Sequence, residues 1–223
     1  MFNSAKVDAA GNIQLSIYAS YGEGSSSSSA SDEGFGHAWL VIENKSSTSY
    51  DFCNTTLMSG ETFSVGTWGN LMDPDTGELH AGTWLNVEAY RGLGDNNTAS
   101  LTITITTSQL EIVSDRCLEL NNWGLFENCA YFASEIWNEI APDSMEVDAN
   151  TLFVYTPSKL KDSIQEIPGS ATNRNFAYNN YTGLCVDGNT FKYVHPSRIV
   201  EMYGTREANE YLECKWQELD LLA

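Results

Sequence analysis

The hydrophobic period changes along this chain, and that change constrains the fold more than any other feature. In the first half, the segment NIQLSIYASY alternates Ile13, Leu15 and Ile17 with polar residues, which is the period of a β-strand. Further strand-like segments lie at 37–44, 48–57, 61–70, 83–91 and 100–107. Gly, Asn and Asp punctuate these short segments, and that spacing favours antiparallel pairing.

Helical spacing takes over after the last of these strands. Residues 108–122 begin with Ser108 and Glu111, the two positions of a capping box. Residues 128–142 predict a second helix that ends at Pro142, and 156–167 predict a shorter third one. The tail predicts a hairpin at 181–194 and helices at 197–204 and 205–222. Strands followed by helices predict an α+β fold in which the two kinds of element are segregated.

Length bounds the domain organisation. The 223 residues favour a single domain over 1–223. Within it we expect a Ser-rich flexible loop at 22–34 and a C-terminal hairpin and helix extension from about 176 to 223.

Charge and motifs exclude several classes of function. The formal net charge is −19, from 30 acidic and 11 basic residues, whereas nucleic-acid binding needs clustered Lys and Arg. No apolar run is long enough for a membrane span, and no signal peptide is visible, so we expect a soluble protein. The sequence contains no nucleotide-binding or zinc-protease motif, and it predicts no cofactor and no metal. Its five cysteines lack ligand spacing and favour free thiols in a reducing compartment.

One of these cysteines has a position that favours chemistry. Asn128 is a suitable N-cap, so Cys129 begins the helix that follows. Phe132, Ala133 and Ile136 recur at helical spacing from it, which places Cys129 on the packing face. A helix N-terminus lowers the pKa of a thiol and favours the nucleophilic thiolate. The alternative is that Cys129 is only a small buried apolar residue.

A thiolate needs a base, and the chain has three histidines. His37 begins the apolar segment 37–44 after a glycine and is the first choice. His80, expected in a loop, is the second choice, and His195 is expected to be an ordinary surface residue.

A third polar group should orient the imidazole. The segment TWLNVEAY, interpreted as a strand, places Trp84, Asn86, Glu88 and Tyr90 on one face. Glu88 is the preferred orienting residue and Asn86 the second choice, with Asp51 as a further alternative.

A histidine at the start of an apolar strand, further strands, and then Asn-Cys at the start of a helix resemble the papain-like fold in its circularly permuted form. That group includes the permuted NlpC-type cell-wall peptidases and the lecithin:retinol acyltransferase-like enzymes. The segments that carry the likeness are GHAWLVIEN, VEAY, and the NC that precedes Phe132, within residues 34–142. The resemblance implies an antiparallel sheet packed against helices, one of which carries Cys129 at its N-terminus.

The sequence therefore predicts a cysteine peptidase or amidase whose catalytic residues are Cys129, His37 and Glu88. The resemblance implies a peptide or amide substrate, with bacterial cell-wall fragments as the commonest case. The alternative is a non-catalytic binding or structural module on the same scaffold.

Overall fold

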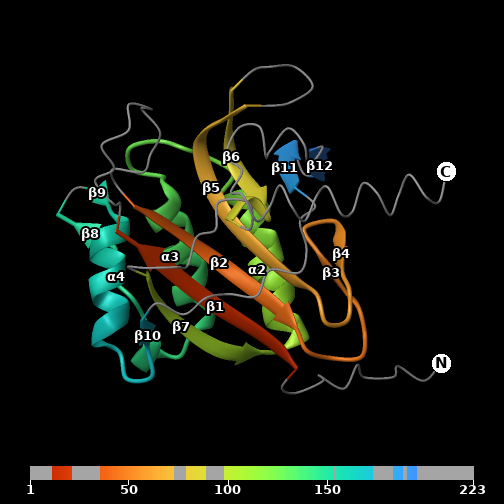
Figure 1. Cartoon of the computed structure of the whole chain (residues 1–223), viewed down its shortest axis with the longest axis horizontal. Coiled ribbons are helices and arrows are strands. Elements are labelled where there is room, and N and C mark those ends of the chain that lie inside the picture. The colour runs from red at the N-terminus through yellow and green to blue at the C-terminus, as the bar shows by residue number, and fades with distance from the viewer. Residues whose placement is uncertain are drawn as a thin grey trace, which may run out of the picture.

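The structure, a computed structural model, describes residues 12–21, 36–72, 79–88, 98–152, 154–172, 183–187 and 190–194. It is an α+β fold in which an antiparallel sheet packs against helices (Figure 1). Among the described residues, eight strands form the main sheet in the order β10-β7-β1-β2-β5-β6-β11-β12. Its strands are β1 (Ile13–Ser20), β2 (His37–Asn44), β5 (Thr62–Met72), β6 (Leu79–Leu85), β7 (Thr98–Ile105), β10 (Ala171–Thr172), β11 (Gly183–Asp187) and β12 (Thr190–Val194).

Two short hairpins lie outside this sheet. Strand β3 (Tyr50–Phe52) pairs with β4 (Thr55–Leu57), and β8 (Asn150–Thr151) pairs with β9 (Val154–Tyr155). Cys53 and Asn54, the two residues that join β3 to β4, both have positive φ, at 50° and 57°. Two consecutive left-handed residues make the tight turn that matches the twist of a two-stranded hairpin.

The helices form the second layer. They are α2 (Thr107–Glu119), α3 (Cys129–Ile140) and α4 (Pro157–Glu166), with a short 3-10 helix η2 (Asp143–Met145) between the last two. In Figure 1, α2 and α3 lie behind the sheet, and α4 lies beside them at its edge. Each of the three α-helices begins at a side-chain cap, since Thr106, Asn128 and Thr156 accept hydrogen bonds from first-turn amides.

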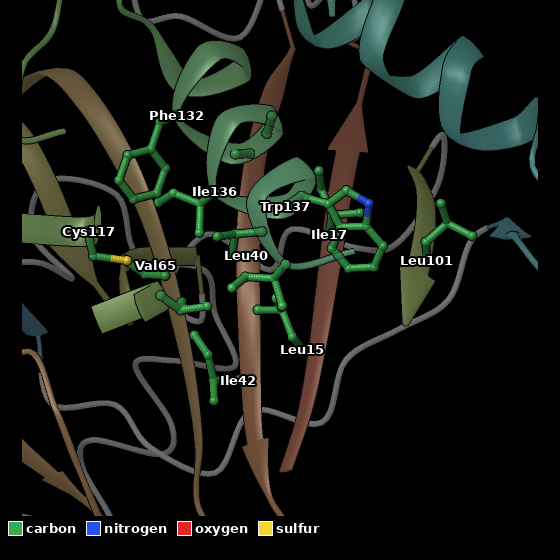
Figure 2. Packing of buried hydrophobic residues seen from close by; sticks show 14 of the residues in the cluster. Leu15, Ile17, Leu40, Ile42, Val65, Leu101, Cys117, Phe132, Ile136 and Trp137 are labelled. Atoms are coloured by element: carbon green, nitrogen blue, oxygen red, sulfur yellow. The ribbon is translucent and has the colours of Figure 1, made fainter. Parts of the chain in front are cut away.

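The two faces of the sheet have different partners. Side chains of β2 alternate, and Ala38, Leu40 and Ile42 belong to the main core cluster together with Phe132 and Ile136 of α3 (Figure 2). Trp39 and Val41 belong instead to a separate buried cluster with Tyr18 of β1. We call the side of the sheet that carries the main core cluster the helical face, and the side that carries Trp39 and Val41 the opposite face.

Most predicted elements are present. Strand β2 spans the expected residues 37–44, and the hairpin predicted at 181–194 appears as β11 and β12. This hairpin is not separate from the domain, because β11 pairs with β6 and extends the main sheet. The helices predicted at 197–204 and 205–222, and the Ser-rich segment 22–34, lie outside the described residues.

The capping box predicted at Ser108 and Glu111 is wrong, because the observed box lies two residues earlier in the chain. The box is made by Thr106 and Gln109, whose side chains each accept a hydrogen bond from the other's backbone amide. Because β7 remains in the sheet until Ile105, the extended residue that follows it is the one that caps the helix.

Candidate active site

His37 is the first residue of β2, and its backbone is fixed there by the neighbouring strand. It lies opposite Ser20 in the β1–β2 register. The Ser20 hydroxyl donates to the His37 carbonyl oxygen at 3.3 Å and accepts from the His37 amide at 3.3 Å. Gly36, directly before it, has a φ of 81°, a conformation that glycine adopts without strain. The start of β2 is therefore held in one position, and His37 is only 6% exposed.

The imidazole of His37 contacts a buried carboxylate. Its Nε2 atom lies 3.0 Å from Oε1 of Glu88, whose exposed fraction is 0%. The indole Nε1 of Trp68 donates to the same oxygen at 3.2 Å, and the Ser64 hydroxyl donates to Oε2 at 2.7 Å. Both oxygens of Glu88 are thus hydrogen-bonded, which is what a buried carboxylate requires.

Aromatic rings hold the imidazole plane. The Trp68 ring stacks on His37 with centroids 3.9 Å apart and an interplanar angle of 30°, and Trp39 stacks at 5.5 Å and 10°. Gly66 leaves the space that this cluster occupies, because a Cβ there would lie 2.6 Å from Glu88 Oε1. We call His37, Glu88, Ser64 and Trp68 the His37 cluster. Together, the ring contacts and the Glu88 bond fix the position of the imidazole.

The expectation that Glu88 lies on a strand face is wrong. Strand β6 ends at Leu85, Asn86 has a φ of 61°, and Val87 and Glu88 are already helical. Asn86 stabilises this bend by two hydrogen bonds to Ser64. The backbone amide of Asn86 donates to the Ser64 carbonyl at 2.8 Å, and the side-chain Oδ1 of Asn86 accepts from the backbone amide of Ser64 at 3.1 Å. The side-chain oxygen of Asn86 thus replaces a backbone carbonyl as hydrogen-bond acceptor for β5. The turn at Asn86 brings Glu88 to His37.

Cys129 is the first residue of α3, as predicted from the sequence. Oδ1 of Asn128 accepts from the amides of Ala130 and Tyr131, and its Nδ2 donates to the carbonyl of Tyr155 at 2.8 Å. These bonds fix the start of the helix, and Cys129 is 4% exposed.

The cysteine and the histidine come from different layers. Cys129 belongs to the core cluster on the helical face, whereas His37 alternates with Ala38 and stacks on Trp39 of the opposite face. Both views show α3 beginning near the end of the sheet where β1 ends and β2 starts (Figures 1 and 2). The first turn of the helix and the start of β2 therefore lie at the same end of the domain.

The other candidates take different positions. Asp51 is an exposed residue of β3 and lines a surface cavity against α2. His80 was expected in a loop, but it lies within β6, opposite Leu71. His195 lies outside the described residues.

Sequence reasoning missed Ser64 and Gly66. Neither residue lies in a recognisable motif. Both come close to His37 because of the strand register: Val41 pairs with Ser64, so the β5 residues after Ser64 lie beside the start of β2. Alternation along β5 would have indicated them only once this pairing was known.

Within the described ranges, no group of three His, Cys, Asp or Glu side chains is arranged to hold a metal ion. In the same part of the chain, no helix has the length and apolar character that crossing a membrane requires. Searches against protein-family models, curated proteins and solved structures each find no match to this chain. The class that the structure defines is therefore an α+β protein with a helix-covered antiparallel sheet and a buried His–Glu pair at one end of it.

Proposed function

We propose that this protein is a cysteine hydrolase, a peptidase or amidase of the circularly permuted papain-like type. Cys129 is the nucleophile, His37 the base, and Glu88 the residue that orients His37. The observation that carries the proposal is the buried contact between His37 Nε2 and Glu88 Oε1, at the end of the sheet where the Cys129 helix begins. An imidazole oriented by a carboxylate is the arrangement that activates a nucleophile in hydrolases of this kind.

In the proposed mechanism the two ring nitrogens of His37 have separate roles. With Nε2–H donated to Glu88, the lone pair of the neutral ring is on Nδ1, and Nδ1 is the atom that accepts the thiol proton. The thiolate then attacks an amide carbonyl, and the amide of Cys129 at the helix N-terminus stabilises the oxyanion. His37 returns the proton to the leaving amine, and water hydrolyses the acyl-enzyme to release the acid and regenerate the thiol.

The net charge of the protein limits the classes of substrate that it can bind well. The net charge of −19 disfavours strongly anionic ligands and favours neutral or cationic peptides and amides. The resemblance to permuted cell-wall peptidases makes short cell-wall-type peptides the first substrates to assay.

Thiol labelling tests the proposal, with Cys117 as an internal control. Burial raises the pKa of the Cys117 thiol, which stays protonated at neutral pH. Iodoacetamide at mildly acidic pH should modify Cys129 well before Cys117, as followed by peptide mass spectrometry. His37→Ala should slow the labelling of Cys129, and Cys129→Ser should abolish amidase activity while the far-UV spectrum and the melting temperature stay unchanged.

A non-catalytic binding or structural module is the second candidate, and one observation favours it. Cys129 of α3 packs in the core on the helical face of the sheet, whereas His37 projects from the opposite face, and both are more than nine-tenths buried. Equal labelling of Cys129 and Cys117, unaffected by His37→Ala, would refute the hydrolase and support this candidate.

A further inference from the structure

We propose that Cys53 and Cys117 are a second thiol site, independent of the proposed hydrolase. In this site the two thiols form a disulfide that joins the β3–β4 hairpin to α2, through reaction with a small cationic disulfide that enters the adjoining acidic cavity.

The turn of the hairpin is attached to the helix at this point. The amide of Cys53 donates to the Ser114 hydroxyl at 2.7 Å, and the Cys53 thiol donates to the Ser114 carbonyl at 3.6 Å. Cys117 lies three residues after Ser114, which is the same side of an α-helix. Both side chains are buried in the same core cluster, and burial together with the neighbouring Cys53 thiol raises the pKa of Cys117. Two elements that are distant in the sequence thus place a cysteine of the hairpin turn beside the turn of α2 that carries Cys117.

Both thiols are free in this structure, and both are completely buried in the main core cluster. Buried cysteines are commonly just small apolar residues. Cys53 differs, because it occupies a turn position with a φ of 50°, where glycine, asparagine and aspartate are the favoured residues. Packing alone does not explain why this turn position holds a cysteine, whereas a disulfide to α2 requires one there.

A cavity of about 510 Å³ adjoins Cys53, the first thiol to react. It lies between the hairpin and α2 and is lined by Cys53 and Ser114, together with the carboxylate residues Asp51, Glu111 and Asp115. Three carboxylates around a cavity repel anions and attract cations. A positively charged disulfide such as cystamine should therefore react faster than glutathione disulfide, which is anionic.

The reaction proceeds in two exchanges. The Cys53 thiolate, formed by loss of its proton to solvent, attacks one sulfur of cystamine and displaces one cysteamine. Cys117 then loses its proton and attacks Cys53 sulfur in the mixed disulfide, which releases the second cysteamine. In total, two protein thiols and one cystamine give one protein disulfide and two cysteamine molecules. Because burial raises the pKa of Cys117, the second exchange should be the slower one and should accelerate with pH.

The test uses the full chain carrying Cys129→Ser, incubated with cystamine or with glutathione disulfide. We expect a Cys53–Cys117 cross-linked peptide pair in non-reducing mass spectrometry, formed several-fold faster with cystamine. The melting temperature should rise by on the order of 10 °C at most, since the cross-link closes the loop from 53 to 117. Dithiothreitol should reverse both changes.

Two variants complete the test. Cys117→Ser should stop the reaction at the mixed disulfide on Cys53, and Glu111→Gln with Asp115→Asn should reduce the preference for cystamine. Absence of the cross-linked peptide after prolonged incubation of the folded protein would overturn the proposal, as would faster reaction with glutathione disulfide. Neither outcome depends on amidase activity, so failure here leaves the proposed hydrolase untouched.

Discussion

Replacing Gly66 with alanine adds one methyl group to the place where the His37 cluster is tightest. The new Cβ would lie 2.6 Å from Glu88 Oε1, 3.2 Å from His37 Nε2 and 3.3 Å from Trp39 Cβ. Ordinary contacts begin at about 3.4 Å, so the carboxylate must withdraw by about 0.8 Å (3.4 minus 2.6). Trp39 Cβ is next to its own backbone in β2 and blocks the retreat of the methyl group in that direction.

The expected cost combines two terms. Adding a methyl group to a packed interior costs about 1–3 kcal/mol, and displacement of Glu88 weakens hydrogen bonds to a charged group, each worth about 1.5–3 kcal/mol. We therefore expect Gly66→Ala to lower the free energy of unfolding by about 3 kcal/mol, measured by urea denaturation monitored through tryptophan fluorescence. The same variant should slow iodoacetamide labelling of Cys129, since it disturbs the orientation of His37.

Gly124→Ala is the matched control. A Cβ at Gly124 meets nothing within 4 Å, so this variant should stay within about 0.5 kcal/mol of the natural sequence. If Gly66→Ala proves as stable as Gly124→Ala, Glu88 moves without cost and the His37 cluster is not a rigid assembly.

Three further substitutions address single parts of the structure. Glu88→Gln keeps acceptor geometry for Trp68 and should cost about 1 kcal/mol, whereas Glu88→Ala leaves three donors without their acceptor and should cost about 3–5 kcal/mol in the same denaturation assay. Asn128→Ala should lower stability by about 1–2 kcal/mol, and Asn128→Asp, which keeps the cap, should lower it less; equal losses would exclude the cap as the cause. Lys161 Nζ lies 3.8 Å from the Tyr21 ring centroid, and burial lowers the pKa of this lysine. The buried charge therefore reduces the free energy of unfolding at every pH below the lowered pKa, and this reduction declines as pH rises toward about 10.5. Lys161→Met should therefore be more stable than the natural sequence by about 1 kcal/mol at pH 7, with a gap that narrows toward pH 10; a gap that widens with pH would contradict this.

Local pattern was sufficient for most of the fold. The apolar character of 37–44 and the helical spacing after Asn128 predicted β2 and α3 with their observed starts, because both patterns follow from which side chains face the core. The local hydrophobic pattern was insufficient where a contact with a distant residue determines the end of an element. Strand β6 stops at Leu85 because Asn86 turns and pairs with Ser64. Asparagine tolerates positive φ, but a single asparagine in the segment TWLNVEAY does not by itself predict that turn.

The candidate site divides in the same way. Residue chemistry, expected positions in strands and the family resemblance together selected His37 and Glu88, and the structure places the two in contact. The supporting residues Ser64, Gly66 and Trp68 depend on the β2–β5 register, which is a long-range property that a single sequence does not specify. Their selection as a group required the sheet to be assembled first.

The composition of the His37 cluster is itself informative about its purpose. A buried carboxylate paired with a histidine contributes little net stability, because removing both groups from water costs about as much as their attraction returns. The surroundings are the apolar rings of Trp39 and Trp68, where well-packed hydrophobic side chains would stabilise the fold at least as well. Yet both oxygens of Glu88 have hydrogen-bond donors, and Gly66 leaves room for them at the cost of an empty side-chain position in a central strand. Packing and stability therefore leave this arrangement unexplained, whereas a need to hold one imidazole in a single orientation accounts for the donors, the stacked rings and the glycine together.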